Sequence, residues 1–445
     1  MLALLTSCVT VGPAKTEAPR SPKTAAPARP AAIAHRGTFW YFVDNITPDA
    51  SNTNRRVQLW AALPPTRSGQ TVRGLKITPT PTEILTDPAA GNRVAYYWSV
   101  DNPTLGQALV FRYDFSVENR PVAFDIEPGK VQLASPRSPE AKRYTTSEPW
   151  LEASPEIGEF SHIFIAMARA LGIPARTIIA NWYQGSGHAW AEIFLPPYGW
   201  IPVDTSGAQL IHNGLKGQMP EENVHKFMQT RGIPTRQPGW LFGHLYPNRL
   251  EVFVGENLTF TARSPGGTRT FNFMPPGGNA AWPPGILLDG LSKKTVHAGF
   301  FLFDAEAGDE ARARAVAEEQ MASGFLAAGL HQRAIAALKR RLQRKPHDVQ
   351  SLFQLGQAYF KLRQYEAAVT AFRSSLRGKG GSLKRTTDTW SRIFLGMCKD
   401  ALGRREEAIA EYNEAIAAGA DYQGALDTAR KFLAEPYQPD AVDKP

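Results

Sequence analysis

The stretch that decides the fold is residues 154–206, which read SPEIGEFSHIFIAMARALGIPARTIIANWYQGSGHAWAEIFLPPYGWIPVDTS. A helix is expected to begin at Ser154-Pro155-Glu156, because serine is a good N-cap, proline suits the first helical position and glutamate favours the positive end of the helix dipole. The helix should end at Leu171-Gly172, since glycine commonly terminates helices. Strands at 177–181 and 188–204 follow, so the stretch predicts a helix and a small antiparallel sheet.

Two polar residues, His188 and Asp204, stand on the predicted strands on either side of a Pro-Pro-Tyr-Gly turn at 196–199. Pairing Phe194 with Trp200 would put Asp204 one diagonal step from His188 on the same face of the sheet. That register requires an odd number of residues in the loop. An even loop would place the two residues on opposite faces, and their contact would then need a bulge.

Three motifs, GEFSHIFIAMARALGIPAR, GHAW and YGWIPVD, occur in that order. They resemble the core of the bacterial transglutaminase-like family, papain-related proteins that use a Cys–His–Asp triad. The resemblance implies a papain-like α+β core and assigns the catalytic histidine and aspartate to His188 and Asp204. The nucleophilic cysteine of the family would stand directly before Gly158, where this chain has Ile157. Isoleucine cannot ionise or attack, so the family's route to acyl transfer is not available.

The expected helix carries an apolar face. Residues spaced i, i+3, i+4 and i+7 are predicted to form one buried stripe: Ile157, Phe160, Ser161, Phe164, Ala168 and Leu171. On this interpretation, Ile157 extends the apolar face into the first turn and fills the nucleophile's place with packing.

Other residues are poor replacements for the nucleophile. Ser161 lies one turn deeper along the helix, about 6 Å from position 157. Ser186 belongs to the wrong loop, and Cys398 belongs to another predicted domain, where it fits a small buried hydrophobe.

Structural interpretations are also open for the conspicuous residues of this stretch. His188 and Asp204 would then be a buried hydrogen-bonded pair that holds the hairpin. His162 would be a partly buried structural residue, and Glu159 would serve the helix start. Four aromatic residues are expected in the core rather than on a substrate platform: Trp182, Tyr183, Trp190 and Trp200.

Outward from this stretch, the chain divides into segments of different character. Residues 35–145 carry short alternating strands and turn signals, which predict an all-β sandwich-like domain. The transglutaminase-like core is expected over 146–265, with strands at Leu250–Val254 and Leu258–Ala262 closing its sheet and one short helix at Glu221–Gln229. Residues 266–311 have little pattern and are interpreted as a covering segment and linker.

The segment 312–435 has helical periodicity and repeats every 34 residues, the tetratricopeptide period. Leu355-Gly356 and Leu395-Gly396 take equivalent positions in two copies, and an earlier copy precedes them. A basic insertion is placed at Gly378–Thr387, and a last helix at Tyr422–Leu433. The predicted fold is therefore multidomain, with an all-β sandwich, an α+β core, an all-α tetratricopeptide solenoid and a tail at 436–445.

The N-terminus reads MLALLTSC and resembles a bacterial lipobox, in which Cys8 would be lipidated. A basic region and a longer apolar segment are nearly missing, so either the start lies upstream or the match is chance. Residues 10–34 are rich in Pro, Ala and Lys, as a tether would be. The lipoprotein interpretation implies a membrane anchor at Cys8 and a place in the cell envelope, at the outer membrane or periplasmic face. A disordered N-terminus of a cytoplasmic protein is the alternative.

Composition narrows the function further. The 445 residues carry a net charge of +9 with a sequence pI of about 9.4, but the basic residues are scattered and no nucleic-acid-binding motif occurs, so no nucleic-acid partner is expected. Two cysteines in unrelated contexts argue against a disulfide and a Cys/His metal site, and no cofactor is expected. No apolar run reaches 18 residues, so none is long enough to span a membrane as a helix.

Two functions follow from these observations. The favoured one is a non-catalytic transglutaminase-like lipoprotein that binds proteins or peptides through its core and the tetratricopeptide groove of 312–435. The alternative is an enzyme acting on protein or peptidoglycan amide bonds, which would use His188 and Asp204 without a cysteine.

Overall fold

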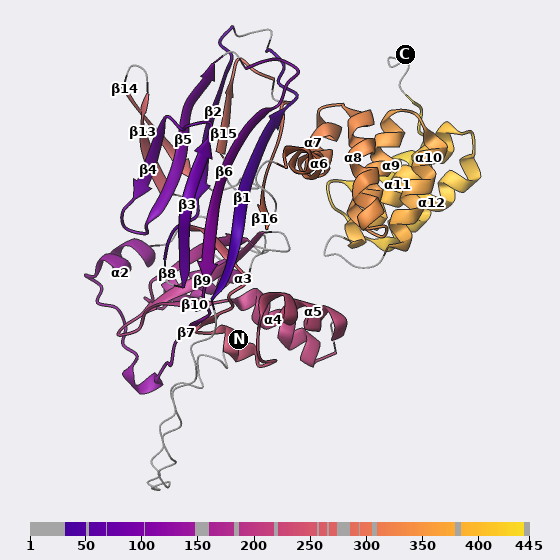
Figure 1. Ribbon diagram of the computed structural model, residues 1–445. Helices are drawn as coiled ribbons and strands as arrows, with labels where there is room; N and C mark the ends of the chain where they lie inside the picture. The colour runs from indigo at the N-terminus through magenta and orange to yellow at the C-terminus, as the bar shows by residue number, and fades with distance from the viewer. Residues whose placement is uncertain are drawn as a thin grey trace.

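The computed structural model describes residues 32–49, 53–67, 69–101, 103–146, 160–181, 187–217, 221–255, 258–264, 267–273, 285–292, 294–304, 309–378 and 384–439. The predicted fold class is confirmed: a strand-rich N-terminal part, an α+β core and C-terminal repeat helices (Figure 1). No helix within these residues is both long and apolar enough to cross a membrane.

Two four-stranded antiparallel sheets form the strand-rich part. Their strands are β1 (Ile33–Asp44), β2 (Arg56–Leu63), β3 (Gln70–Thr78), β4 (Glu83–Asp87), β5 (Asn92–Asp101), β6 (Leu109–Asn119), β15 (Gly285–Asp289) and β16 (Val296–Phe303). One sheet has the order β16-β1-β6-β3, and the other has the order β15-β2-β5-β4. A shared cluster of buried side chains from both sheets makes this pair a β-sandwich.

Strand β1 is buried on both faces. Successive side chains of a strand point to opposite sides, so Phe39 and Tyr41 enter the sandwich core while Trp40 and Phe42 point the other way. The second face is covered by helices of the C-terminal array. This double burial explains why the strand reads as a continuous apolar run rather than as an alternating one.

Residues 285–303 differ from the covering segment and linker that the sequence suggested for 266–311. Strand β15 pairs with β2, and β16 pairs with β1 in a register that sets Phe300 opposite Trp40. Each sheet of the sandwich is therefore completed by a strand from far along the chain. In sequence, the α+β core lies between the early strands of the sandwich and these two late strands. A strand whose partner is some 250 residues away gives no local hairpin signal, so its pairing cannot be recognised from sequence pattern.

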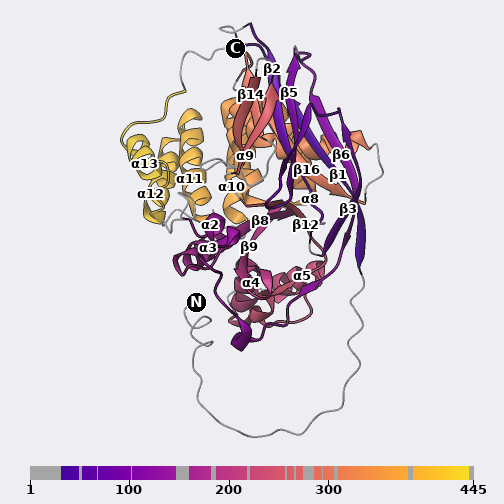
Figure 2. The same ribbon diagram turned by 90° about the vertical axis from the view of Figure 1, so that its left-hand side faces the viewer.

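The core begins after β6. Its elements are β7 (Val122–Ala123), η1 (Pro128–Lys130), α2 (Pro139–Tyr144), α3 (Phe160–Ala170), β8 (Ala175–Asn181), β9 (Gly187–Leu195), β10 (Gly199–Val203), α4 (Thr205–Leu215), α5 (Glu221–Arg231), η2 (Pro238–Leu241), β11 (His244–Leu245), β12 (Leu250–Val254), β13 (Leu258–Ser264) and β14 (Gly267–Phe273). The antiparallel sheet has the order β10-β9-β8-β12, and α4 and α5 lie below it in Figure 2.

Strand β12 joins the core sheet beside β8, as predicted, and α5 occupies the place of the expected short helix. The expectation that Leu258–Ala262 closes the same sheet is wrong. The chain turns at Gly255, whose φ is 84°, and β13 pairs instead with β14 as a separate hairpin. Helix α4 was not predicted, because the Gly- and Pro-rich composition of its surroundings concealed it.

The buried face of α3 differs in part from the predicted stripe. Ser161, Ile165 and Ala168 are buried, whereas Phe160 is 45% exposed and Leu171 is 58% exposed. The face that meets the sheet is centred on Ile165, one helical turn after Ser161, and Leu171 follows the last helical residue. Ile157 lies outside the described residues, so its place on this face stays a prediction.

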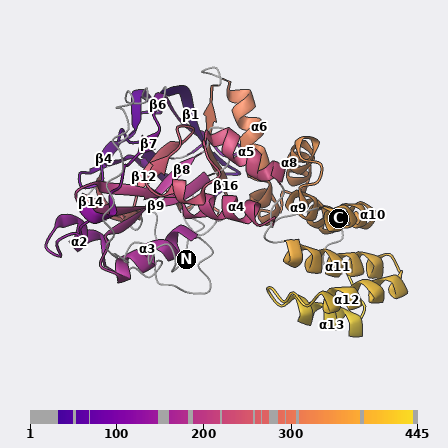
Figure 3. The same cartoon turned by 90° about the horizontal axis from the view of Figure 1, so that it is seen from below.

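The C-terminal part is an array of antiparallel helices. They are α6 (Glu310–Gln320), α7 (Ala322–Ala327), α8 (His331–Arg344), α9 (Val349–Lys361), α10 (Tyr365–Arg377), α11 (Lys384–Ala401), α12 (Arg405–Ala418) and α13 (Ala425–Ala434). Figure 3 shows the later helices extending away from the rest of the molecule. Helix α13 is the predicted last helix, beginning three residues later than expected. Five residues of the predicted insertion, 379–383, lie outside the described part of the chain.

The array is fixed to the sandwich by its first helices. Ala313 and Ala317 of α6 and Phe325 of α7 share a buried cluster with the outer face of β1 and β16. An ion pair of 2.7 Å between Arg333 and Asp44 adds a charged contact beside this cluster. Consequently, the start of the predicted groove at 312–435 is covered by the sheet, and α6 and α7 serve as an attachment.

Candidate functional site

His188 and Asp204 meet at the edge of the core sheet. Phe194 pairs with Trp200, as the odd-loop register requires, and the ladder ends with Val203 opposite Ala191. Asp204 therefore comes one diagonal step from His188, and His188 Nε2 lies 3.0 Å from Asp204 Oδ2. The structure thus brings together the two site residues that the sequence indicated, without a bulge.

Asp204 accepts three further hydrogen bonds besides the contact with His188. The hydroxyl of Tyr246 donates to Oδ2 at 2.9 Å, and Oδ1 accepts from the hydroxyl of Ser206 at 3.1 Å and the backbone N–H of Gly207 at 2.9 Å. The last bond makes Asp204 the N-cap of α4. The carboxylate is fully buried, so these donors supply the solvation that water would otherwise provide.

The donors also set the charge of Asp204. Burial by itself would raise the pKa of this carboxyl group, but the charge and hydrogen bond of His188, with the bonds from Gly207 and Tyr246, lower it to about 2. The group is therefore an anion at neutral pH. It holds Nε2 of His188 as a donor, so any proton transfer between this histidine and a reacting group would pass through Nδ1.

Tyr246 is the residue of the site that sequence analysis missed. It is fully buried, and both its burial and the neighbouring Asp204 raise the pKa of its hydroxyl well above the usual value. The hydroxyl is thus a permanent donor to the carboxylate. Tyr246 sits in a short irregular segment after β11, and a single tyrosine there carries no pattern that would connect it with Asp204.

The structure describes two of the residues considered as replacement nucleophiles. Ser161 is buried, and its hydroxyl donates to the backbone carbonyl of Ala189 at 3.2 Å. Cys398 is buried within the helical array, and burial raises the pKa of its thiol to about 12. Neither environment activates a nucleophile, because Ser161 has no basic acceptor in this bond and Cys398 stays protonated.

Two of the four aromatic residues predicted for the core lie in the described part of the chain, and both pack against neighbouring side chains. Trp190 is fully buried, with its ring centroid 6.1 Å from that of His188. Trp200 is partly buried and lies under the guanidinium of Arg176, whose central carbon is 3.7 Å from the ring centroid. His162 is partly buried on α3, as expected. Some predicted positions lie outside the described residues: Cys8, Ile157, Glu159, Trp182, Tyr183 and Ser186.

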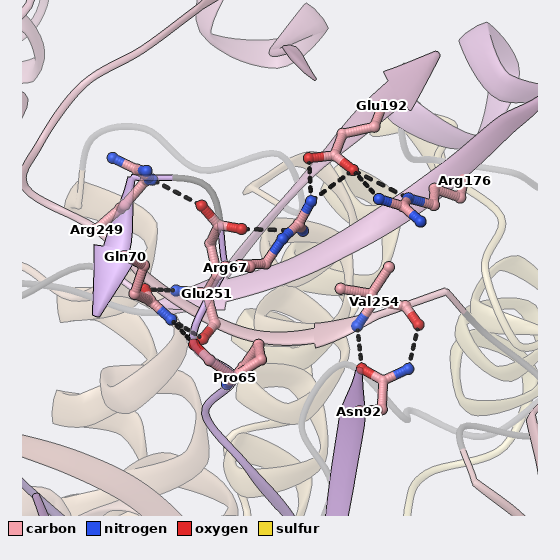
Figure 4. Close-up of polar contacts among 9 residues, drawn as sticks. All are labelled: Pro65, Arg67, Gln70, Asn92, Arg176, Glu192, Arg249, Glu251 and Val254. Atoms are coloured by element: carbon pink, nitrogen blue, oxygen red, sulfur yellow. Dashed lines mark hydrogen bonds and ion pairs between the residues drawn. The ribbon is translucent and has the colours of Figure 1, made fainter. Parts of the chain in front are cut away.

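A chain of buried charges begins at Glu192 on β9, the strand that carries His188, and crosses to the sandwich (Figure 4). Glu192 of β9 accepts from Arg176 at 2.8 Å and from Arg67 at 2.6 Å. Arg67 also lies 3.0 Å from Glu251, which pairs with Arg249 at 2.9 Å. Burial would raise the pKa of Glu192, but the two guanidinium groups lower it. These ion pairs connect the segment before β3 with β8, β9 and β12.

Two amide side chains complete the joint by capping the edge of β12. Gln70 accepts from the backbone N–H of Glu251 at 2.7 Å and donates to its carbonyl at 2.9 Å. Asn92 does the same to Val254, at 2.8 and 2.7 Å (Figure 4). An edge strand otherwise leaves unpaired backbone groups. Here, side chains of the sandwich bond to backbone groups of Glu251 and Val254, which joins β12 to the sandwich at the edge of the sheet that also contains β9.

Within the part of the chain that the structure describes, no group of three or more His, Cys, Asp or Glu side chains is arranged to hold a metal ion. The chemistry that the geometry offers is that of an oriented histidine beside a buried anion. Such a pair can take a proton from a neighbouring nucleophile, and it can equally serve as a structural hydrogen bond.

Comparisons with known proteins agree with the two recognised parts of the chain. Residues 137–205 match the family model of the transglutaminase-like superfamily, and residues 349–377 and 391–418 match that of the tetratricopeptide repeat. The chain therefore combines a transglutaminase-like core with tetratricopeptide repeats, an arrangement typical of protein-interaction modules. A comparison with curated proteins gave no match.

Two solved structures are similar to parts of the chain. A candidate cysteine protease from Cytophaga hutchinsonii shares 10% identity over 62% of this chain and 94% of its own length, with a TM-score of 0.25. The crystal structure of MamA shares 20% identity over 26% of this chain and 72% of its own, with a TM-score of 0.22.

Proposed function

We propose that this chain is a non-catalytic scaffold of the bacterial cell envelope, in which the tetratricopeptide repeats bind a protein or peptide and the transglutaminase-like core serves as a platform. The observation that carries the proposal is the bonding of Asp204. Three of its four hydrogen-bond partners belong to the architecture: the start of α4 and the buried Tyr246. Asp204 therefore has a structural role that operates without a nucleophile.

The nucleophile's position supports the same conclusion. Ile157 occupies the place of the family's cysteine, and loss of a covalent nucleophile costs several orders of magnitude in rate. Ser161 and Cys398, the other candidates within the described residues, are held in environments that leave them unactivated.

The binding surface is best placed on the middle of the array. Helices α6 and α7 pack on the sandwich, whereas one face of α9 is partly or fully exposed at Gln350, Gln354, Gln357 and Lys361, which follow one another at helical spacing. Repeat arrays commonly take an extended or helical peptide along such a surface. The rigid attachment through α6 would hold this surface at a fixed orientation to the core.

Anchorage at the envelope rests on Cys8 and the tether at 10–34. Lipidation of Cys8 would place the folded part at the end of the predicted tether, where a repeat array could reach partners at the membrane surface. Replacement of Cys8 by serine should release the chain from the membrane fraction if the cysteine is the anchor. Unchanged membrane association in this variant would contradict the proposal.

Protein binding is tested by a photo-crosslinking residue in the full chain at Gln357, with a matched one at Arg73, an exposed residue of β3 on the sandwich. A defined partner protein should be captured from envelope extract at Gln357 and not at Arg73. Equal capture at both positions, or none, would contradict binding through the repeats.

The alternative function, an amide-cleaving or amide-transferring enzyme, is favoured by the 3.0 Å contact and the low pKa of Asp204. It predicts activity on protein or peptidoglycan amides that His188→Ala abolishes, and such a result would overturn the scaffold proposal. The Ile157→Cys variant tests whether the rest of the catalytic site is intact. Rapid labelling of the new thiol near neutral pH, slowed by adding His188→Ala, would show that only the nucleophile was lost.

A further inference from the structure

The end of the described chain folds back onto the repeat array. After α13, residues 435–439 cross the end of α11, and the backbone N–H of Tyr437 donates to Oδ2 of Asp400 at 2.9 Å. The ring of Tyr437 lies 5.5 Å, centroid to centroid, from the rings of both Phe360 and Phe432. One tyrosine thereby touches two consecutive repeats and the last helix.

The seat that receives Tyr437 is built without the tail. Asp400 accepts from Arg405 with both oxygens at 3.0 Å, and from the hydroxyl of Tyr412 at 2.9 Å. Arg405 also donates to the carbonyls of Phe432 and Leu433, which closes the end of α13. These contacts do not involve the tail, so they would keep the carboxylate in place, able to accept a backbone N–H, when the tail leaves.

The tail is largely exposed. Glu435, Pro436 and Gln438 are exposed, whereas Tyr437 is partly buried and donates the hydrogen bond to Asp400. Prolines at 436 and 439 cannot donate backbone hydrogen bonds and favour an extended conformation. Segments that are largely exposed open easily. With the tail away, the ring of Phe360, only 7% exposed in its presence, would face solvent.

We infer that this seat, formed by Phe360, Asp400 and Phe432, recognises an extended, proline-flanked tyrosine segment of a partner protein, and that Tyr437 occupies it as an internal competitor. The inference rests on the proposed protein-binding function and specifies its ligand. The aromatic surface takes a ring, and the carboxylate takes a main-chain N–H and disfavours an adjacent acidic residue. Extended proline-containing peptides bind aromatic-lined surfaces in this manner because little conformational entropy is lost.

The internal competitor should weaken external binding by a predictable factor. A short tether holds its end at an effective concentration of about 1 mM. For a peptide with a dissociation constant of about 0.1 mM, which suits a single ring and hydrogen bond, the tail would occupy the seat most of the time. External affinity would then fall roughly tenfold.

The test uses a fluorescent peptide with the sequence AEPYQP, residues 434–439, and fluorescence anisotropy with the full chain. Tyr437→Ala should bind this peptide about tenfold more tightly than the wild-type chain. The matched control is Tyr422→Ala, which removes a tyrosine that is 54% exposed and should leave the affinity at the wild-type value. A peptide with alanine in place of tyrosine should not bind. Equal affinities of the wild-type and Tyr437→Ala chains, or binding of the alanine peptide, would overturn the inference.

A second measurement uses only the wild-type chain, so it does not depend on correct folding of the Tyr437→Ala variant. In the wild-type chain, saturating peptide should displace the tail, so amide hydrogens of 435–439 should exchange faster by mass spectrometry. Unchanged or slower exchange would overturn the inference, as would a dimer of the wild-type chain formed by exchange of tails.

Failure of this inference is distinguishable from failure of the protein-binding function. Capture of a partner at Gln357 with equal peptide affinities would leave the function standing and the tail seat refuted. Tenfold tighter peptide binding by Tyr437→Ala without any captured protein would support the seat and contradict the function.

Discussion

Replacement of Asp204 by asparagine removes the charge on which the core site depends while keeping the size of the side chain. The pKa of Asp204 is lowered from 3.8 to about 2 in the folded protein. A difference of nearly two pH units corresponds to about 2 kcal/mol in favour of the folded state. Because the folded-state pKa is the lower one, this stabilisation is present above pH 4 and is lost as the pH falls toward 2.

The asparagine variant should therefore open its core about 2 kcal/mol more easily at pH 7, which corresponds to roughly thirtyfold faster amide exchange. Hydrogen exchange followed by mass spectrometry over α4 and β9 measures this locally, so independent unfolding of the repeats does not interfere. The difference between wild type and variant should shrink between pH 4 and pH 2, after correction for intrinsic exchange rates. A difference below about 0.5 kcal/mol at pH 7, or one that does not shrink with acid, would refute this reasoning. Glu221→Gln, which changes an exposed carboxylate of α5, is the matched control.

Three further outcomes follow from buried groups. Glu192→Gln should destabilise the joint between sandwich and core by about 3–5 kcal/mol, because it removes the carboxylate that pairs with the buried Arg176 and leaves Arg67 with Glu251 alone. Glu118→Gln, in an exposed pair, should stay within about 0.5 kcal/mol in the same exchange assay. Gly207→Ala should lower the melting temperature, since a methyl group would crowd the Asp204 carboxylate, whereas Gly239→Ala meets open space and should be neutral; equal melting temperatures would contradict this. Cys398 should resist maleimide at pH 8 in the folded chain and react on unfolding, and rapid labelling at Cys398 itself, distinguished from Cys8 by peptide mass spectrometry, would show that its thiol is not buried.

The core site could be predicted where its determinants are local. The Pro-Pro-Tyr-Gly turn and the alternation of β9 and β10 fix the register, and the register alone brings His188 to Asp204. Asp204-Thr205-Ser206 does carry an N-cap signal, but the Gly- and Pro-rich surroundings concealed the helix that it begins. The role of Tyr246 could not be predicted, since its contact depends on how an irregular segment returns to the sheet.

The fold, too, could be predicted where its sequence signals are local, and not where it depends on contacts between distant segments. The 34-residue period identifies the repeats, since the two helices of each copy pack in the same way: the ring of Phe372 fills the space beside Gly356, as that of Tyr412 does beside Gly396. The pairing of β16 with β1 was missed, because apolar patterning shows that a strand is buried and does not identify its partner. Burial of β1 on both faces was missed for the same reason, because the helices that cover its second face follow it by about 270 residues.

On the proposed function, the distribution of buried charge would explain how the core keeps Asp204 without catalysis. Asp204 anchors α4 and Tyr246, and Glu192, four residues beyond His188 on β9, anchors the sandwich. Removing either carboxylate would leave several buried donors unsatisfied, at a cost of about 1–3 kcal/mol for each donor. The sequence predicts no comparable cost for an apolar side chain at position 157. Under the scaffold proposal, loss of the nucleophile would therefore cost less stability than loss of Asp204.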